Sequence, residues 1–485
     1  MQLKRPDLLR QQCYLNGKWS DADDGSTAPV TNPATGEVIA HVPMMGAAET
    51  TRAIDAAKVA QKSWAARTAK DRAGVLRKWF DLMMANQEDL AVILTTEMGK
   101  SLAEARGEIA YGASFIEWFA EEGKRVYGET IPQHAVDKRI LVLKQPIGVT
   151  AAITPWNFPN AMITRKVGPA LAAGCAQVIK PALETPLSAF ALAVLAEEAG
   201  LPAGLMSVIT GNSRAIGGEM TSNPTVTKLS FTGSTEVGRV LMQQCAPTIK
   251  KLALELGGNA PFIVFDDADL DSAVEGAIIS KFRNSGQTCV CANRLFVQAG
   301  IYDKFAEKLA ARVATFKVGN GMDEGVNQGP LINESAVLKV EEHIADVVAH
   351  GGTVAVGGKR HVLGHSFFMP TVLTGVTADM KIFREETFGP VAPLIKFKDE
   401  ADVIELANRT EFGLASYFFS RDIGRIFRVA EALEYGMVGV NTGLISTAEA
   451  PFGGVKQSGL GREGSRHGIE DYLEIKYVCL GDINK

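Results

Sequence analysis

Cysteine is scarce in this chain, with six residues among 485. A secreted scaffold that depends on disulfides needs a much higher density of cysteine, so that class of protein is excluded. Long apolar runs are missing too, because no stretch reaches the roughly 18 residues that a membrane-spanning helix needs. The first twenty residues, MQLKRPDLLRQQCYLNGKWS, lack the apolar segment of a signal peptide. We therefore expect a cytoplasmic protein that does not enter a membrane.

An excess of positive charge is also absent, since the formal net charge is -5. The chain thus has no basic footprint for nucleic acid or an anionic lipid surface. Histidine is sparse, and His343, His350, His361 and His365 show no familiar metal-ligand spacing with the cysteines. What is present is an ordinary globular composition, with 46% hydrophobic and 22% charged residues. At about 150 residues per domain, the length predicts two to four domains.

The hydrophobic periodicity changes once along the chain. Residues 51–123 carry an apolar stripe at helical spacing, formed by Leu76, Phe80, Met83, Leu90 and Leu94. From residue 147 onward, short β-rich runs alternate with helical stretches, which is typical of βα units in mostly parallel sheets. The runs predicted as strands are IGVTAAIT (147–154), AQVIK (176–180), LMSVIT (205–210), TKLSF (227–231), PFIVF (261–265), RLFVQ (294–298), VAPLIKF (391–397), LASYFFS (414–420) and GMVGVN (436–441). Helices are expected near 160–173, 186–199, 214–221, 235–246, 301–315 and 421–433.

These elements predict an α/β fold with two open parallel-sheet domains. We expect the boundary near the glycine pair Gly257 and Gly258. The first domain then comprises 1–124 and 146–257, and the second comprises 258–440.

Two segments fit neither domain. RILVLKQP (139–146) and EIKYVCL (474–480) have the composition of strands and few helix signals. Isolated strands need partners. We therefore expect a small β-arm, at 125–145 and 465–485, that pairs with another subunit.

Three polar motifs follow predicted strands of the first domain, at the edge where open α/β sheets place ligands. Asn157 in TPWNFP can donate from its amide without carrying charge, or it caps the next helix. Lys180 ends the strand in VIKP, where a cation can meet ribose or phosphate; the alternative is a solvated lysine. Gly233 and Ser234 in FTGSTEVG form a turn before a helix, which favours a phosphate or merely caps the helix.

One motif is misleading. GLGREG (459–464) matches G-x-G-x-x-G, the dinucleotide fingerprint. That fingerprint requires a preceding strand and a βαβ unit after it. Here a glycine-rich stretch precedes the motif and only 21 residues follow it. We predict a loop instead.

The two cysteines in SGQTCVCAN (285–293) have four alternative roles. A zinc site needs about four ligands, and no histidine lies nearby. A disulfide between Cys289 and Cys291 is sterically strained. A buried filler suits an apolar run, whereas polar, turn-like residues surround Cys289. A nucleophile is left, and it needs a base and an oxyanion donor. Asn157 can be the donor, and Glu255, beside the glycine pair, is either the base or a surface residue at a hinge.

Together these motifs resemble the aldehyde dehydrogenase superfamily over nearly the whole chain. The stretches that carry the resemblance are TPWNFP, VIKPALETP, FTGSTEVG, ELGGNAP, GQTCVCAN, EETFGPV and PFGGVKQSG. Within the superfamily, WNFPNAMITRKVGPALAAGC, FRNSGQTCVCANR and GLIS resemble succinate-semialdehyde dehydrogenases, whose near neighbours act on glutarate semialdehyde. The resemblance implies a cofactor-binding domain, a catalytic domain and a bridging β-arm, in a homodimer or homotetramer.

The resemblance also implies a role for each matching residue. Cys289 matches the nucleophile, Glu255 the general base and Asn157 the oxyanion donor. The implied cofactor positions are Trp156, Lys180, Gly233, Ser234, Leu256, Glu386 and Phe388. The residues that grip a distal carboxylate of the substrate are Arg165, Arg283 and Ser446. The implied reaction is oxidation of succinate semialdehyde to succinate through a thiohemiacetal and a thioester on Cys289, without a metal.

Leu183 departs from the pattern of many NAD-dependent relatives, which carry glutamate three residues after the matching lysine. Without that carboxylate a 2′-phosphate meets less repulsion, so we expect NADP, although Glu184 stands next door and use of NAD stays open.

Two rival hypotheses are a thiol acyltransferase or hydrolase without redox chemistry, and a non-catalytic member of the fold. Cys291 is either a packed small residue or a partner that traps Cys289 in a reducible disulfide under oxidation.

Overall fold

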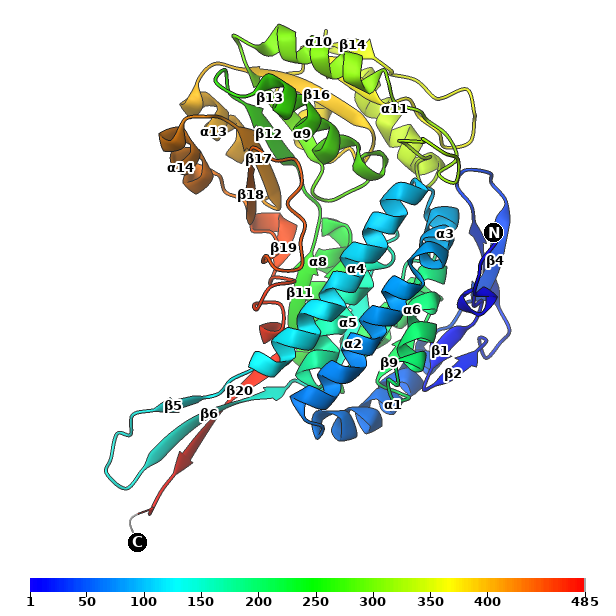
Figure 1. Ribbon diagram of the computed structural model, residues 1–485, viewed down its shortest axis with the longest axis vertical. Helices are drawn as coiled ribbons and strands as arrows, with labels where there is room; N and C mark the ends of the chain where they lie inside the picture. Colours follow the sequence, from blue (N-terminus) through cyan, green and yellow to red (C-terminus); the bar gives the residue numbers. More distant parts are fainter. Residues whose placement is uncertain (484–485) are drawn as a thin grey trace.

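The computed structural model describes residues 1–483 and shows two α/β bodies from which a thin β-arm extends (Figure 1). Each body is built on one sheet, and the two sheets divide the chain between β11 (Lys251–Glu255) and β12 (Ala260–Val264). This architecture confirms the predicted α/β fold with two open sheets. Among residues 1–483, no helix has the length and apolar character needed to cross a membrane.

The first body contains an eight-stranded sheet with the order β19-β11-β10-β7-β8-β9-β1-β2. Its parallel strands are β7 (Val149–Ile153), β8 (Ala176–Lys180), β9 (Met206–Val208), β10 (Val226–Thr232) and β11. Its antiparallel strands are β1 (Cys13–Leu15), β2 (Lys18–Ser20) and β19 (Gly459–Leu460). The strand order reverses between β7 and β10, and residues that follow strands at such a reversal meet in one crevice.

Helices cover this sheet on both sides. Those that follow its parallel strands are α5 (Ala161–Ala173), α6 (Leu187–Glu198), α7 (Ser213–Ser222) and α8 (Thr235–Cys245), close to the predicted ranges. The predicted helical region before the sheet is four helices, α1 (Ala47–Ala65), α2 (Ala69–Ala85), α3 (Gln87–Met98) and α4 (Leu102–Glu122). A separate hairpin is formed by β3 (Thr27–Thr31) and β4 (Val38–Pro43). Every residue of α5 is buried, because α4 packs on the side of α5 that faces away from the sheet.

The second body contains a seven-stranded sheet with the order β14-β15-β16-β13-β12-β17-β18. Besides β12, its strands are β13 (Ala292–Gln298), β14 (Thr353–Val356), β15 (Thr371–Thr374), β16 (Val391–Phe397), β17 (Ala415–Phe419) and β18 (Met437–Val440). Its helices are α9 (Leu270–Phe282), α10 (Tyr302–Val313), α11 (Glu334–Ala349), α12 (Lys381–Arg384), α13 (Glu400–Asn408) and α14 (Ile423–Ala432). Phe262 and Val264 of β12 belong to one apolar cluster, and Ile263 and Phe265 to another. Both faces of the strand are therefore buried, which explains its uninterrupted apolar sequence.

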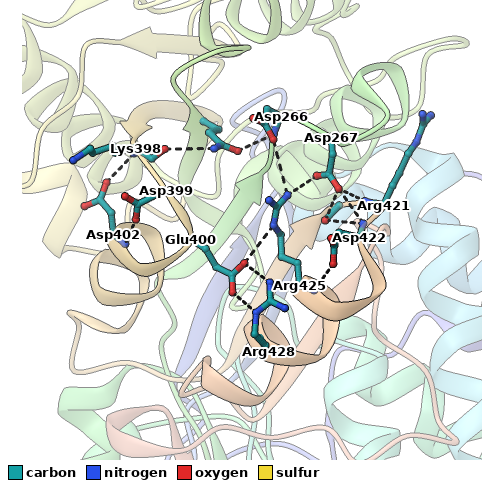
Figure 2. A network of polar contacts seen from close by, with 12 residues as sticks. Asp266, Asp267, Lys398, Asp399, Glu400, Asp402, Arg421, Asp422, Arg425 and Arg428 are labelled. Atoms are coloured by element: carbon teal, nitrogen blue, oxygen red, sulfur yellow. Dashed lines mark hydrogen bonds and ion pairs between the residues drawn. The ribbon is translucent and has the colours of Figure 1, made fainter.

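Charged residues fill the edge of the second sheet where its parallel strands end (Figure 2). Arg425 Nη1 lies 2.8 Å from Asp267 Oδ1, just after β12. Arg428 Nε lies 2.7 Å from Glu400 Oε1, at the start of α13. Each partly exposed pair contributes little by itself, but together they tie the starts of α13 and α14 to the end of β12. The nucleophile candidate Cys289 lies at the opposite end of this sheet, just before β13.

The arm is a three-stranded antiparallel sheet with the order β20-β6-β5. Its strands are β5 (Glu129–Ile131), β6 (Arg139–Pro146) and β20 (Leu473–Leu480). The two predicted strands are confirmed, and β6 and β20 pair with each other within the chain. Pairing of the arm with another subunit stays a prediction. Ile469 and Tyr472 belong to the core of the first body. The arm therefore begins at β20 rather than at residue 465, and residues 484–485 lie outside the described part.

GLGREG was predicted to be a loop, and the structure refines this. Its first two residues form β19, which pairs antiparallel with Leu254 and Glu255 at the edge of the first sheet. The rest is loop, and Phe452 pairs with Glu463 in an isolated bridge. The segment after β18 thus returns from the second body to the first.

Candidate active site

A cavity of about 240 Å³ lies between the two bodies. Its walls come from the loops after β7 and β10, the end of β11, and the loop before β13. The predicted site residues that line it are Trp156, Asn157, Arg165, Gly233, Ser234, Glu255, Leu256, Arg283, Cys289, Glu386, Phe388 and Ser446. Lys180 is the predicted site residue that does not line it. Residues scattered over nearly three hundred positions thus share one cavity.

The loop that carries Cys289 has an unusual backbone. Asn284 and Ser285 adopt left-handed φ angles of 53° and 57°, and Gly286 follows at 76°. A Cβ at Gly286 would lie 2.1 Å from the Gly389 carbonyl oxygen, so a larger residue does not fit there. At Gly258 a Cβ would lie 2.4 Å from the carbonyl oxygen of Cys289. The glycine at 258 therefore lets the backbone between the two sheets approach the nucleophile loop.

Cys289 and Glu255 both lie in a poorly solvated environment. Burial raises the pKa of the Cys289 thiol to about 12, against an opposing effect of the Arg165 cation. Burial and the charge of Glu463 raise the pKa of Glu255 well above its usual range. The Glu255 side chain is 3% exposed, and neither of its oxygens has a hydrogen-bond partner among residues 1–483. The alternative of a surface glutamate at a hinge is therefore wrong, and a free carboxyl group faces the cavity.

Asn157 is held by its amide. Its Nδ2 donates to the Gln287 carbonyl oxygen at 3.0 Å, within the nucleophile loop. An amide nitrogen carries two hydrogens, so one is left for the cavity. The helix-cap alternative is wrong, because the residue before α5 is Asn160 and the Asn157 amide bonds to Gln287 instead.

Two arginines lie in this cavity. The Arg165 guanidinium is 3.9 Å from the Phe452 ring centroid, and its Nη2 has no hydrogen-bond partner in the described part of the chain. Arg283 lies 4.9 Å from the Phe158 ring centroid. A second cavity, of about 260 Å³, shares Arg283 and Ser446 with the first. The arginines and Ser446 can thus meet an anionic group on a small molecule that reaches Cys289.

On the other side of the cavity, the geometry suits a dinucleotide. Glu386 accepts from the Gly258 N–H at 3.2 Å, and burial raises the pKa of Glu386 to about 7. The ring centroids of Trp156 and Phe388 lie 5.6 Å apart, with the two rings edge to face. A Cβ at Gly233 would lie 2.4 Å from the Phe231 ring, so a residue with a side chain does not fit there. The turn before α8 therefore presents backbone without a side chain at this position. Bare backbone at a helix start is where a phosphate binds.

The structure bears on the alternative roles of Ser234, as a helix cap or a phosphate contact, and of Lys180, as a ligand contact or a solvated side chain. The Ser234 hydroxyl accepts from the Val237 N–H at 3.4 Å, so Ser234 does cap α8. Its predicted phosphate contact stays a prediction. Lys180 is buried rather than solvated; its Nζ donates to the Pro181 carbonyl oxygen at 3.3 Å, and burial lowers its pKa. A buried ammonium with one protein acceptor has two hydrogens left for a ligand.

Comparison with known proteins decides the family. A model of the aldehyde dehydrogenase family matches residues 19–478. The chain belongs to the aldehyde dehydrogenase family.

The relatives of this aldehyde dehydrogenase are similar over their full length. The chain is 67% identical to the glutarate-semialdehyde dehydrogenase of Pseudomonas aeruginosa, covering 100% of both proteins. It is 66% identical to the succinate-semialdehyde dehydrogenase [NADP(+)] GabD of Escherichia coli, covering 99% of this chain and 100% of the relative. It is 65% identical to the 3-sulfolactaldehyde dehydrogenase of Pseudomonas putida, covering 100% of both. A crystal structure of an NADP-dependent E. coli enzyme matches with a TM-score of 0.98 at 66% identity, covering 99% of this chain and 100% of that one. Members of the family use NAD or NADP.

The structure of this aldehyde dehydrogenase reveals buried charges that the sequence analysis missed. Glu463 forms an ion pair with Arg165, Nε to Oε2 at 2.8 Å, and a second, short one with Lys166. Lys166 Nζ also donates to Thr232 Oγ1 at 2.6 Å. Glu463 lies in GLGREG, and an acid in an otherwise glycine-rich loop was the available signal. The cations beside Glu255 therefore have their own counter-ion.

Cys291 differs from Cys289 in its surroundings. It is buried, its thiol donates to the Lys281 carbonyl oxygen at 3.4 Å, and it accepts from Thr288 Oγ1 at 3.0 Å. The packed-residue alternative fits this position. All six cysteines are free, so the redox role of Cys291 stays a prediction.

Among residues 1–483, no three His, Cys, Asp or Glu side chains are grouped to hold a metal ion.

Proposed function

We propose that this aldehyde dehydrogenase oxidises succinate semialdehyde to succinate. The observation that carries the proposal is the presence of Arg165, Arg283 and Ser446 in one cavity with Cys289. The aldehydes named for the three relatives each carry an anionic group away from the aldehyde carbon, which is a carboxylate or a sulfonate. Arginine binds such a group through two parallel hydrogen bonds. Arg165 has an unpaired Nη2 available for it.

In the proposed mechanism, the Cys289 thiol gives its proton to solvent water, and the thiolate sulfur then bonds to the aldehyde carbon. The new oxyanion accepts from the second Nδ2 hydrogen of Asn157 and from the Cys289 backbone N–H. Neutral donors stabilise this charge without adding a cation next to the cofactor. Bound NAD(P)+ supplies the hydride acceptor. Glu255 then takes a proton from water, and the hydroxide so formed cleaves the thioester on Cys289.

The runner-up substrate is glutarate semialdehyde, one methylene longer. A methylene changes discrimination by only about 1–3 kcal/mol. The test is kcat/KM for a panel of aldehydes and semialdehydes of three to six carbons, each with NAD+ and NADP+. We expect the highest value with succinate semialdehyde. A higher value for a neutral aldehyde of equal length would overturn the anionic substrate class.

A thiol acyltransferase or hydrolase is the rival from another class. It predicts ester hydrolysis without formation of reduced cofactor from any aldehyde in the panel. The buried Lys180 and the bulk-free turn at Gly233 argue against it, because neither is needed for acyl transfer.

We further propose NADP+ as the preferred cofactor, with NAD+ also accepted. The support is the leucine at 183 and the name of the E. coli relative. Glu184 opposes this preference, because its charge lies close enough to Lys180 to favour the protonated form of that lysine. We expect Leu183→Glu to raise the NAD+ over NADP+ ratio of kcat/KM by about tenfold or more, which corresponds to about 1.4 kcal/mol. Glu184→Gln should move the ratio the other way. A wild-type preference for NAD+ would contradict the proposal.

For the molecule as a whole, we propose a cytoplasmic homodimer or homotetramer. The arm supports the assembly, because β5 and β20 are edge strands of a small exposed sheet. The six free cysteines support the cytoplasmic location, because the cytoplasm keeps thiols reduced. Light scattering on the purified protein measures the assembly, and a monomer at micromolar concentration would contradict it.

A further inference from the structure

A buried ion pair lies behind the nucleophile and the oxyanion donor. Lys100 Nζ and Glu108 Oε2 are 2.6 Å apart, and each side chain is 1% exposed. Lys100 precedes α4, and Glu108 lies in its second turn. Such a pair is costly to desolvate and is weak evidence for stability by itself. Its contacts suggest another use.

The ion pair contacts the segment that carries Asn157. Lys100 Nζ donates to the Asn157 carbonyl oxygen at 2.8 Å. Glu108 Oε1 accepts from the backbone N–H groups of Asn160 and Ala161, at 3.0 and 3.3 Å. The two partners therefore hold both sides of the turn from β7 into α5.

Asn284 joins this segment to the nucleophile loop. Its Nδ2 donates to the Asn157 carbonyl oxygen at 3.0 Å and to the Gln287 carbonyl oxygen at 3.3 Å. The Gln287 oxygen also accepts from Asn157 Nδ2. The Gln287 carbonyl thus orients the side-chain amides of both Asn157 and Asn284. Because it accepts a hydrogen bond, the nitrogen of the Asn157 amide, rather than its oxygen, faces the nucleophile loop. The Asn284 backbone N–H donates to Glu104 Oε1 at 2.7 Å, which ties this left-handed residue to α4 as well.

From these contacts we infer that Lys100, Glu108 and Asn284 are positioning residues for the oxyanion site. They fix the backbone of Asn157 relative to the Cys289 loop, so that the Asn157 amide and the Cys289 N–H converge on one point. None of the three acts on the substrate in this role. The inference rests on the proposed function, because it concerns the donor that the proposed reaction needs.

The test compares reactions that need the oxyanion site with one that does not. The variants are Lys100→Met with Glu108→Gln, and separately Asn284→Gly. The double variant removes both charges while the glutamine oxygen still accepts from Asn160 and Ala161. Glycine at 284 tolerates the left-handed backbone and keeps the N–H donor to Glu104. Arg106→Met is the matched control, since Arg106 lies on α4 like Glu108 but forms an exposed ion pair with Glu88 of α3.

Three rates are measured for each protein: aldehyde oxidation, hydrolysis of p-nitrophenyl acetate, and alkylation of Cys289 by iodoacetamide. Alkylation displaces iodide and forms no oxyanion. We expect the first two rates to fall by about 10- to 1000-fold, in line with the loss of one oxyanion donor. Alkylation and the KM for cofactor should stay within about threefold of wild type in each variant, and the control should change nothing.

Two outcomes would overturn the inference. One is an unchanged kcat in both variants, and the other is a parallel loss of alkylation, which would mean that these residues merely support the loop. If the double variant does not fold, Asn284→Gly decides the result alone. A wild type that hydrolyses the ester but oxidises no aldehyde would refute the proposed function, while the ester and alkylation rates would still judge the inference.

Discussion

At the scale of single residues, burial and the nearby Glu463 raise the pKa of Glu255 well above its usual range. A general base acts only in its deprotonated form, so thioester hydrolysis should accelerate as the pH rises towards that pKa. We expect kcat to rise with pH over a range that lies above the ordinary pKa of a glutamate. Glu463→Gln removes a repelling charge, so it should lower the pKa of Glu255 and move the rise to lower pH. A pH profile of kcat for both proteins measures the shift, and an unchanged profile in Glu463→Gln would refute this electrostatic effect.

Glu255→Gln separates the two halves of the reaction. Glutamine cannot deprotonate water, whereas attack by Cys289 needs no hydrolysis of the thioester. We expect a burst of one equivalent of reduced cofactor per active site, followed by turnover slowed by at least about a hundredfold, at the low end for losing a general base. Stopped-flow absorbance measures both phases. Cys289→Ala is the control and should bind cofactor without any burst.

Arg283→Ala tests the recognition of the distal carboxylate. Loss of one partner of a buried charge pair costs about 2–5 kcal/mol. We expect kcat/KM for succinate semialdehyde to fall at least about 30-fold, at the low end of that range, while butanal, its neutral analogue, changes little. Equal losses for the two aldehydes would show that Arg283 supports the cavity rather than the carboxylate.

Cys291 allows a redox prediction. If it can trap Cys289, peroxide should inactivate the wild type in a way that dithiothreitol reverses. Cys291→Ala should then lose the reversible fraction, because the oxidised Cys289 thiol has no partner and is oxidised further. Reversible inactivation that is the same in both proteins would end this hypothesis.

At the scale of elements, Glu97 connects α3 to the start of α6. Its oxygens accept from the backbone N–H groups of Leu187 and Ser188, at 2.7 and 2.9 Å. Both groups are among the donors that a helix start leaves without an intrahelical partner. We expect Glu97→Ala to lower the free energy of unfolding by about 1–3 kcal/mol, measured by urea denaturation. Glu97→Gln keeps one acceptor and should cost less; equal stability of all three proteins would contradict the capping role.

The sequence was most informative where local pattern decides structure. The strand at 261–265 was predictable because both of its faces are buried and its residues are all apolar. Asn157, Glu255 and Cys289 were predictable through motifs that lie next to strand ends. Glu463 was not, because its partner Arg165 is almost three hundred residues away and no spacing rule connects them. The same holds for Lys100 and Asn284, which contact Asn157 from 57 and 127 residues away along the chain.

At the scale of the whole molecule, the arm presents apolar side chains to solvent in this single chain. Ile475 and Tyr477 of β20 are 72% and 60% exposed. If the arm makes the subunit contact, Ile475→Glu with Tyr477→Glu should convert the assembly to smaller species, because buried charges oppose association. Light scattering measures the mass. Val362→Glu, at a residue that is 95% exposed on the second body, is the control and should leave the mass unchanged.

The pairing of β6 with β20 also has a consequence for the order in which the protein can be made. The two strands are adjacent in the arm, yet more than three hundred residues of chain separate them. A ribosome delivers β6 early and β20 among the last segments, so β6 keeps an open edge while both bodies fold. A nascent or prematurely ended chain therefore lacks a finished arm even when its cavity residues are already present. If the arm makes the proposed subunit contact, only a chain that reaches β20 has the complete arm for that contact.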